Sequence, residues 1–177
     1  DLVRMFNVAD PVRHALSKPL YAEPGARFDY CNASTNILGD VVRRATGRRL
    51  DHFADTVLLA PLGINTRGWH RMSGDVVLAS GDLELRPRDM AKLGQLFLDR
   101  GVWNGRRVVS AEWVDRATAR VVRPGREHAW ADWYGYGWWH WDLKAGGRTW
   151  PAYMASGWGG QWIVVVPPAD LVFVSTG

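Results

Sequence analysis

Apolar residues in the first part of the chain recur at the spacing of one face of an amphipathic helix. This pattern predicts a helix from about Ala33 to Thr46, and Gly47 marks its end. A second, short helix is expected from about Leu50 to Leu59, where Pro61-Leu62-Gly63 would stop it. The inward positions of these two helices would be Ile37, Leu38, Val41, Val42, Ala45, Leu50, Phe53, Val57 and Leu58.

The middle of the chain combines an irregular stretch with two further helices. From Thr66 to Ser80 the apolar residues recur at neither helical nor strand spacing, and glycines interrupt the segment. A third helix should open at Pro87, because proline is favoured in the first turn of a helix. Trp103-Asn104-Gly105 has the composition of a tight turn, and Ser110 would cap a short helix through about Ala119. The apolar stripe of the third helix would be Met90, Leu93, Leu96 and Phe97.

Strand patterns replace helical ones towards the C-terminus. The segment from Tyr134 to Trp141 is aromatic and strand-like, and Gln161–Val166 is a β-branched run. Leu171–Val174 follows after a short turn, so the last two runs should pair as an antiparallel hairpin. Helices followed by strands indicate an α+β fold. We expect one domain over residues 1–177, helix-rich to about residue 125 and built of strands from about 126 to 177.

Composition narrows the class of protein. A chain of 177 residues, 47% hydrophobic and 23% charged, is typical of one globular domain with a sizeable core. The net charge is +4, but acidic residues are interspersed throughout, so we do not expect a nucleic-acid partner. No stretch has the apolar length of a transmembrane segment. The chain starts at Asp1 without an initiator Met, which suggests a trimmed or fragmentary N-terminus and indicates no compartment.

Several common catalytic patterns are missing from the sequence. There is no Gly-x-Ser-x-Gly elbow, and the stretch around Ser156 has Met154 in place of the first glycine. There is no His-Glu-x-x-His pair, and the five histidines are scattered singly. Cys31 is the only cysteine, which excludes an internal disulfide and a multi-cysteine metal site. We therefore predict no metal and no cofactor, and a cysteine hydrolase using Cys31 has little support.

Two short stretches remain as candidate chemistry. In Tyr30-Cys31-Asn32 a phenol and an amide would share one side of an extended segment. A phenol can act as acid or base when nearby cations lower its pKa, although an ordinary core tyrosine is the commoner case. In Trp158-Gly159-Gly160-Gln161 the two glycines allow close approach of a backbone or a substrate, which suits an oxyanion-hole N–H but also a plain bulge.

Together these segments resemble the serine β-lactamases, the penicillin-binding proteins and their esterase and amidase relatives. The order of the matching segments covers most of the chain, which is more specific than any one of them. The resemblance implies an α+β fold of the β-lactamase/transpeptidase type, an antiparallel sheet of five strands flanked by helices, here incomplete. The matching segments are Pro24 to Asn32, Pro61 to Ile64, Asp89 to Leu96, Gly101 to Gly105, Ser110 to Val114, Tyr136 to Trp139 and Gly157 to Gly160.

The resemblance also implies roles for individual residues. This family uses a Ser-x-x-Lys motif for the nucleophile, and no serine in the 177 residues has lysine three positions later. In relatives that motif lies upstream of Tyr-x-Asn, so we expect it before Asp1. Tyr30 would be the general base and Asn32 would bind the substrate carbonyl or amide. Trp158, Gly159 and Gly160 would form the third motif at the substrate, and the Gln161 backbone N–H would be one oxyanion donor.

The residues of the third motif, Trp158 to Gly160, indicate which class of substrate is expected. β-Lactamases resemble one another in having Lys-Thr-Gly there, and Trp158 cannot supply the cation that helps to bind a β-lactam carboxylate. We therefore expect a serine hydrolase of small esters or amides, inactive as this chain alone. The alternatives are a β-lactamase or penicillin-binding D,D-peptidase, and a fragment or degenerate relative that binds peptides or acyl compounds without turnover. The oligomeric state is not indicated by the sequence.

Overall fold

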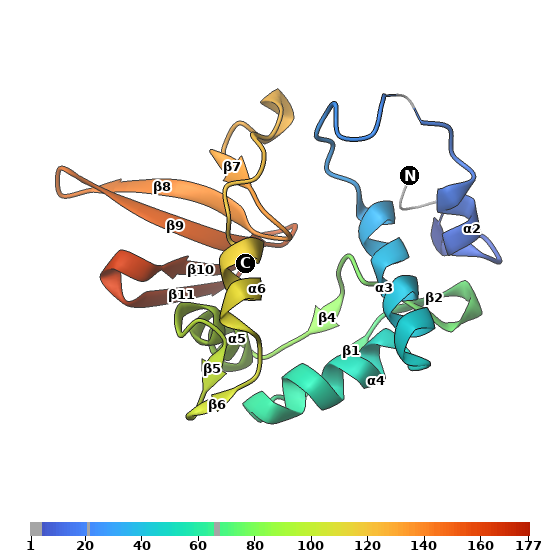
Figure 1. Cartoon of the computed structure of the whole chain (residues 1–177), viewed down its shortest axis with the longest axis horizontal. Coiled ribbons are helices and arrows are strands. Elements are labelled where there is room, and N and C mark those ends of the chain that lie inside the picture. Colours follow the sequence, from blue (N-terminus) through green and yellow to red (C-terminus); the bar gives the residue numbers. More distant parts are fainter. Residues whose placement is uncertain (1–4, 21, 66–67) are drawn as a thin grey trace. The chain divides into compact units, whose positions relative to one another are not determined.

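The computed structural model describes residues 5–20, 22–65 and 68–177. It divides into two compact units, residues 1–85 and 86–177, each of which is described separately (Figure 1). Helix α5 (Pro87–Leu98) packs with the strands of the second unit, so this unit contains both helices and strands. The predicted α+β class is confirmed.

The first unit is mainly helical. Its helices are α2 (Pro11–Leu16), α3 (Asn32–Thr46) and α4 (Leu50–Ala54). A π-helical turn, Asp55–Leu59, and a 3-10 turn, Ala60–Leu62, continue α4. Two small antiparallel pairs follow, in which β1 (Gly68–Trp69) pairs with β4 (Leu83–Glu84) and β2 (Arg71–Met72) pairs with β3 (Val76–Val77). Strands β1, β2 and β3 lie in the stretch from Thr66 to Ser80 that was predicted to be irregular, and β4 lies just after it. Residues 66 and 67 of that stretch are outside the described part.

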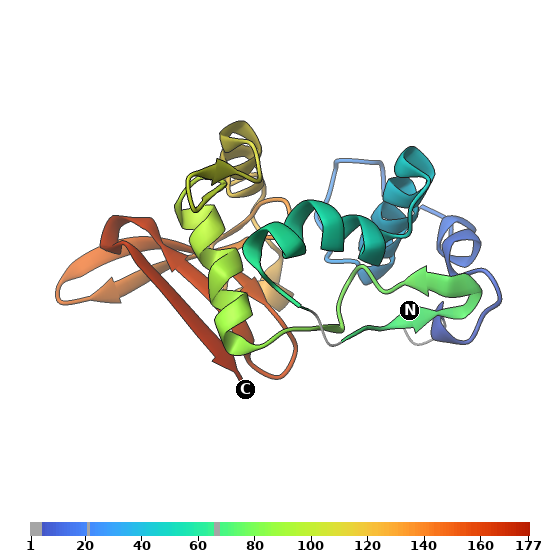
Figure 2. The ribbon, with the colours of Figure 1, turned by 90° about the horizontal axis from the view of Figure 1, so that it is seen from below.

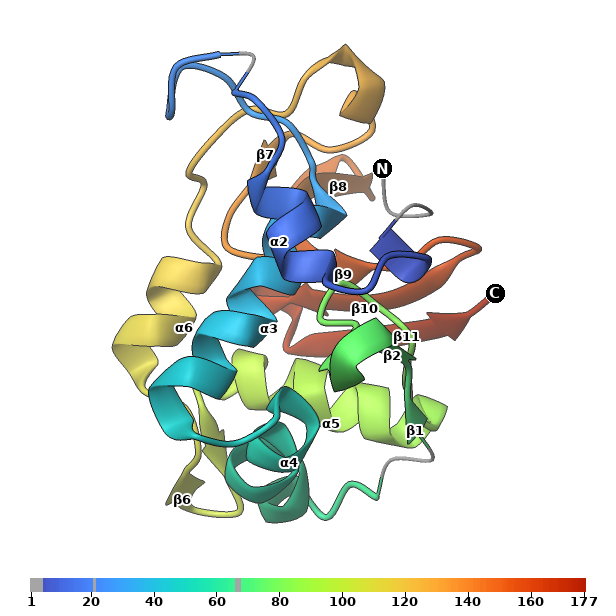
Figure 3. The ribbon, with the colours of Figure 1, turned by 90° about the vertical axis from the view of Figure 1, so that its right-hand side faces the viewer.

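Helix α3 matches the predicted span but not the predicted face. Gly47 ends it in the left-handed conformation, with φ of 68°. The buried residues of α3 are Asn36, Gly39 and Asp40, whereas Leu38 is 62% exposed and Val41 is 52% exposed. The periodicity was correct, but the side of α3 that packs within this chain carries polar and small residues. Figure 3 shows α3 alongside α2 in this unit.

The segment after α3 also buries other residues than expected. Val57, which we placed inward, is 43% exposed, while Leu59 and Leu62 are 2% exposed. The physical reason is the switch from α-helix to π-helix at Asp55, since an extra residue in the turn rotates the following side chains. The predicted stop at Gly63 is correct, and this residue takes the left-handed conformation.

The second unit is built on a five-stranded antiparallel sheet. Its strands are β7 (Trp133–Tyr134), β8 (Trp139–Ala145), β9 (Arg148–Ser156), β10 (Gln161–Val166) and β11 (Leu171–Thr176). Their order in the sheet is β11-β10-β9-β8-β7, so each strand pairs with its neighbour in sequence (Figure 1). The predicted hairpin of β10 and β11 is confirmed, whereas β9 was not predicted and the aromatic segment 134–141 is split between β7 and β8.

Helix α5 (Pro87–Leu98) lies across β10 and β11, as Figure 2 shows. Gly94 makes this contact possible, because a Cβ at that position would lie 2.6 Å from Val172 Cγ1 and 2.9 Å from Ile163 Cγ2. The short hairpin of β5 (Val102–Trp103) and β6 (Arg106–Arg107) and helix α6 (Ala111–Ala117) complete the unit. Ser110 caps α6 as predicted, with its hydroxyl accepting from the Trp113 N–H at 3.1 Å.

The sheet and its helices enclose the core of the second unit. Val165 is completely buried, and Phe97 of α5 packs on Trp138 with ring centroids 4.5 Å apart. The buried cluster consists of Ala117, Trp138, Tyr153 and Val165, with Phe97, Leu98, Ala155 and Val172 packed against it. Short 3-10 turns lie at Ser73–Asp75 in the first unit and at Arg126–His128 and Pro167–Ala169 in the second.

Candidate functional site

Tyr30, Cys31 and Asn32 lie where an extended segment enters the N-terminus of α3. Cys31 has an extended backbone, with φ of −131° and ψ of 108°, and Asn32 is the first residue of the helix. Tyr30 is 40% exposed and Asn32 is half-buried. The N-terminus of a helix carries partial positive charge and unpaired N–H groups. This position therefore favours negative charge on a group held beside it, whether a phenolate or the oxygen of a polarised carbonyl.

The surroundings of Tyr30 within this chain do not favour the phenolate that a general base requires. Burial raises the pKa of the Tyr30 phenol above its ordinary value. A general base works best with a pKa near the operating pH, so the phenol needs a neighbouring cation to become an effective proton acceptor. The lysine of a Ser-x-x-Lys motif is a group of the required charge.

Cys31 lies between the two candidate residues and is exposed. Burial raises the pKa of its thiol, but hydrogen bonds from Ser34 and from the Ala33 N–H outweigh burial and lower the pKa below its ordinary value. No histidine or carboxylate is within hydrogen-bonding contact of Cys31 among the residues that the structure describes. A cysteine nucleophile uses such a base, so the local contacts of Cys31 do not favour this role.

Trp158, Gly159 and Gly160 form the turn between β9 and β10. The turn is closed by the Gly157 N–H, which donates to the Gln161 carbonyl at 2.7 Å. Gly159 and Gly160 have φ of 91° and 93°, a region that only glycine adopts easily. A Cβ on Gly160 would lie 3.3 Å from Gly177 Cα, so another backbone approaches these glycines closely.

The Trp158 side chain is 99% exposed, so it packs against almost nothing within this chain. Gln161 is the first residue of β10, and its register partner is Thr176 of β11. Tyr30 and Asn32 belong to the first unit, and Trp158, Gly159, Gly160 and Gln161 belong to the second. That all six residues serve one active site remains a prediction.

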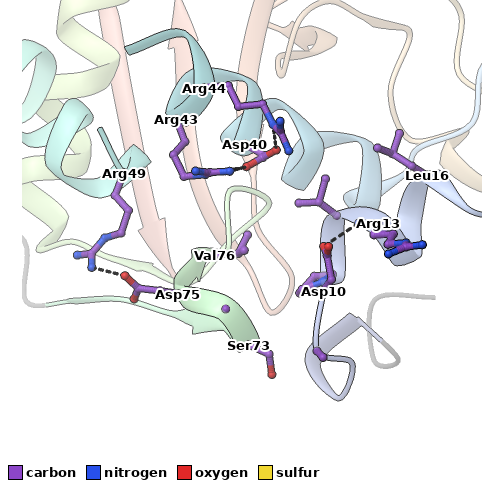
Figure 4. Close-up of a pocket in the computed structure, with 14 residues that line it drawn as sticks. Asp10, Arg13, Leu16, Asp40, Arg43, Arg44, Arg49, Ser73, Asp75 and Val76 are labelled. Atoms are coloured by element: carbon purple, nitrogen blue, oxygen red, sulfur yellow. Dashed lines mark hydrogen bonds and ion pairs between the residues drawn. The ribbon is translucent and has the colours of Figure 1, made fainter. Parts of the chain in front are cut away.

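A hollow of about 720 Å³ lies in the first unit, between α2, α3 and the turn at Ser73 (Figure 4). Five of its charged side chains form ion pairs within the hollow, and the Asp10 carboxylate accepts the Arg13 backbone N–H instead. Asp40 is 7% exposed and binds Arg43 and Arg44, each at 2.7 Å, and Arg49 binds Asp75 at 2.6 Å. Burial raises the pKa of the Asp40 carboxyl, but Arg44 and Arg43 outweigh burial and hold it below its ordinary value.

Neither Tyr30 nor Asn32 lines this hollow. Arg43, Arg44 and Arg49 bind carboxylates of the same unit, so these charged residues stabilise the fold of the unit. Residues 5–20, 22–65 and 68–177 contain no cluster of three or more His, Cys, Asp or Glu side chains arranged to hold a metal ion. Over the same residues, no helix has the length and apolar character needed to cross a membrane.

The antiparallel sheet with a helix across it, and a Tyr-x-Asn segment at a helix N-terminus, are features of the β-lactamase class of serine hydrolases. The chain matches the beta-lactamase family over residues 2–175 and belongs to it. The predicted resemblance and the predicted fold are thereby confirmed.

The chain is similar to one curated protein in sequence and to two solved structures in fold. The 6-aminohexanoate-dimer hydrolase of Paenarthrobacter ureafaciens is 36% identical over 93 residues, which are 52% of this chain and 24% of that protein. The structure titled "Putative 6-aminohexanoate-dimer hydrolase from Bacillus anthracis" aligns with a TM-score of 0.75 and 25% identity over 90% of this chain and 40% of that one. A D-stereospecific amidohydrolase from Streptomyces sp. aligns with a TM-score of 0.69 and 18% identity, over 93% and 54% of the two chains.

Proposed function

We propose that this chain is part of a serine hydrolase that acts by acyl-serine transfer on small esters or amides. The observation that carries the proposal is the Tyr30-Cys31-Asn32 segment, which the fold places at the N-terminus of the 15-residue helix α3 in a chain of the beta-lactamase family. The nucleophile would come from a Ser-x-x-Lys motif outside residues 1–177. The chain spans between a quarter and about half of the three relatives, so the activity belongs to the longer protein.

The proposed reaction begins with the serine hydroxyl. Tyr30, as a phenolate stabilised by the lysine, would take the hydroxyl proton while the serine oxygen forms a bond to the substrate carbonyl carbon. The carbonyl oxygen would become an oxyanion bound by the Gln161 N–H. Collapse of this intermediate breaks the bond to the leaving amine or alcohol, which receives the proton from Tyr30. A water molecule, deprotonated by the same phenolate, would then form a bond to the acyl carbon. The bond to the serine oxygen would break, and this oxygen would take the proton back from Tyr30, so that the acid is released and the serine is restored.

Substrate choice is supported by two kinds of observation. Two of the three similar proteins are named as 6-aminohexanoate-dimer hydrolases and the third as a D-stereospecific amidohydrolase, which favours a small amide as substrate. In addition, the predicted third motif offers Trp158 instead of a cation, and an exposed aromatic side chain suits a neutral acyl group. A β-lactamase or D,D-peptidase would need an arginine to replace the missing lysine, and a degenerate binding fragment would show no turnover.

The experiment compares specificity constants on the full-length protein. The substrates are an activated short-chain ester, a small linear amide and a chromogenic cephalosporin. Losing one charge-assisted hydrogen bond costs about 1.5–3 kcal/mol, or roughly ten- to a hundredfold in kcat/KM, so the ester and amide should be preferred by at least that factor. A higher kcat/KM for the cephalosporin would restore the β-lactamase assignment, and no turnover of any substrate would favour the binding fragment.

A further inference from the structure

The side chain of Asn36 is completely buried in α3, although asparagine is a polar residue. Its Oδ1 accepts a hydrogen bond from the Ser80 backbone N–H at 3.0 Å, across 44 positions of sequence. Asn36 lies four residues after Asn32, and Gly39 lies three residues further on, so all three share one face of the helix. The face of α3 that carries Asn32 is therefore the face that contacts the turn at Ser80.

The turn Leu78–Gly81 is held from several sides. The Trp69 indole N–H lies 2.9 Å from the carbonyl oxygens of both Leu78 and Gly81. On the side of α3, a Cβ at Gly39 would lie 3.0 Å from the Ala79 Cβ, so the helix and the turn are already in close contact. The Trp69 bonds hold this turn independently of α3, so the turn can act as a support for the helix.

The stability of the fold does not by itself explain why position 36 carries asparagine and not an aliphatic residue. Within residues 5–20, 22–65 and 68–177, Asn36 Nδ2 and Ser80 Oγ are both buried without a hydrogen-bond partner. A buried donor without a partner costs free energy, which an aliphatic side chain of similar volume avoids. Only the Oδ1 of Asn36 makes a bond, and this bond joins α3 to the rigid turn.

We propose that Asn36 is a positioning residue for the Tyr30–Asn32 segment, acting through its bond to Ser80. The proposal rests on the proposed function, because it requires Tyr30 and Asn32 to act on the substrate. The ends of a helix fray more readily than its middle. Anchoring α3 one turn beyond Asn32 fixes the direction in which the Asn32 amide and the preceding Tyr30 phenol enter the site. Small misplacements of reacting groups lower turnover strongly.

The test uses three variants of the full-length protein, measured with the best ester or amide substrate. Asn36→Leu removes the acceptor, Asn36→Asp keeps an oxygen at the same position, and Ser80→Ala removes the unpartnered hydroxyl but leaves the main-chain bond. We expect Asn36→Leu to lower kcat about ten- to a hundredfold with a much smaller change in KM. Asn36→Asp should recover most of kcat, and Ser80→Ala should match the unchanged protein.

Thermal unfolding separates this role from a merely structural one. Asn36→Leu removes a buried unpaired amide but leaves the Ser80 N–H without an acceptor, so the two effects oppose and the Tm should move by only a few degrees. A large fall in Tm with unchanged kcat in the folded fraction would overturn the proposal. If Asn36→Leu does not fold, Gly39→Ala pushes Ala79 away from the same face of α3 and should lower kcat in the same way. An unchanged kcat in Gly39→Ala would then refute the proposal.

Tyr30→Phe, measured alongside, distinguishes the two hypotheses. If Tyr30→Phe is nearly inactive while Asn36→Leu keeps its full kcat, the positioning role is wrong and the proposed function stands. If Tyr30→Phe keeps its full kcat, the proposed function is wrong, and the positioning role is overturned with it.

Discussion

Replacing Tyr30 by Phe in the full-length protein removes one oxygen atom and little else. The side chain is 40% exposed, so the substitution leaves the packing of the ring intact and should change the free energy of unfolding by well under 1 kcal/mol. If Tyr30 is the general base, the proton transfer that it performs is lost. Such a loss lowers turnover by about 10²–10⁴, which corresponds to roughly 2.7–5.5 kcal/mol on the activation barrier.

The pH dependence makes this test sharper. Burial alone raises the pKa of the Tyr30 phenol, so activity near neutral pH requires a cation that lowers it. The rate of the unchanged protein should therefore rise with pH through the pKa of the phenol, and this rise should disappear in Tyr30→Phe. Tyr136 offers a matched control, because it is 52% exposed and stacks on Trp113 in the second unit. Steady-state kinetics in which Tyr30→Phe and Tyr136→Phe lose equally little would refute the reasoning.

Two further predictions concern the second unit. Gly94→Ala should lower the free energy of unfolding of this unit by about 1–3 kcal/mol in chemical denaturation, because the new Cβ meets Val172 and Ile163. At an open helix position the same substitution would raise stability by up to about 1 kcal/mol. A more stable variant would therefore show that α5 does not lie on β10 and β11. His140 is 5% exposed, and burial, followed by the charge of Arg120, lowers the pKa of its imidazole. Its neutral form is favoured in the folded state, so stability should be constant above about pH 6.5 and fall as the pH drops through that value. A melting temperature that falls as steeply between pH 7.5 and 5 in His140→Gln would contradict this assignment.

The helices and the final hairpin could be predicted because their signals are local. Proline at the start of α5, Ser110 before α6 and Gly47 after α3 each fix a helix end by backbone chemistry that does not depend on distant residues. The run Gln161–Val166 is likewise a strand by composition. Such features follow from the chain alone, and the structure confirms them.

The buried face of α3 could not be predicted from hydrophobicity. Asn36 is buried because its amide binds a backbone N–H 44 residues away, and Asp40 is nearly buried because two arginines neutralise it. Both compensations depend on tertiary contacts. Nothing in the sequence indicates that Asn36 is buried with its Nδ2 unpaired, so this candidate positioning residue could not be predicted.

Strand β9 escaped prediction because Pro151 interrupts it, and proline argues against a central strand. The pairing explains how the residue is accommodated. Pro151 lies opposite Asp142 of β8, whereas β10 pairs only with residues 153–156 of β9. Pro151 is therefore in the part of β9 that has a neighbour on one side only. The candidate residues themselves came from the family resemblance, since neither Tyr30 nor Trp158 stands out by composition.

Covalent labelling tests the central claim most directly. The full-length protein is treated with a fluorophosphonate, which reacts with activated serines, and the labelled peptide is located by mass spectrometry. We predict stoichiometric label on one serine outside residues 1–177, with lysine three positions later, and no label on a protein consisting of residues 1–177 alone. Stoichiometric label on a serine within residues 1–177, such as Ser156, would contradict the proposal that this chain supplies the base and the substrate contacts but not the nucleophile.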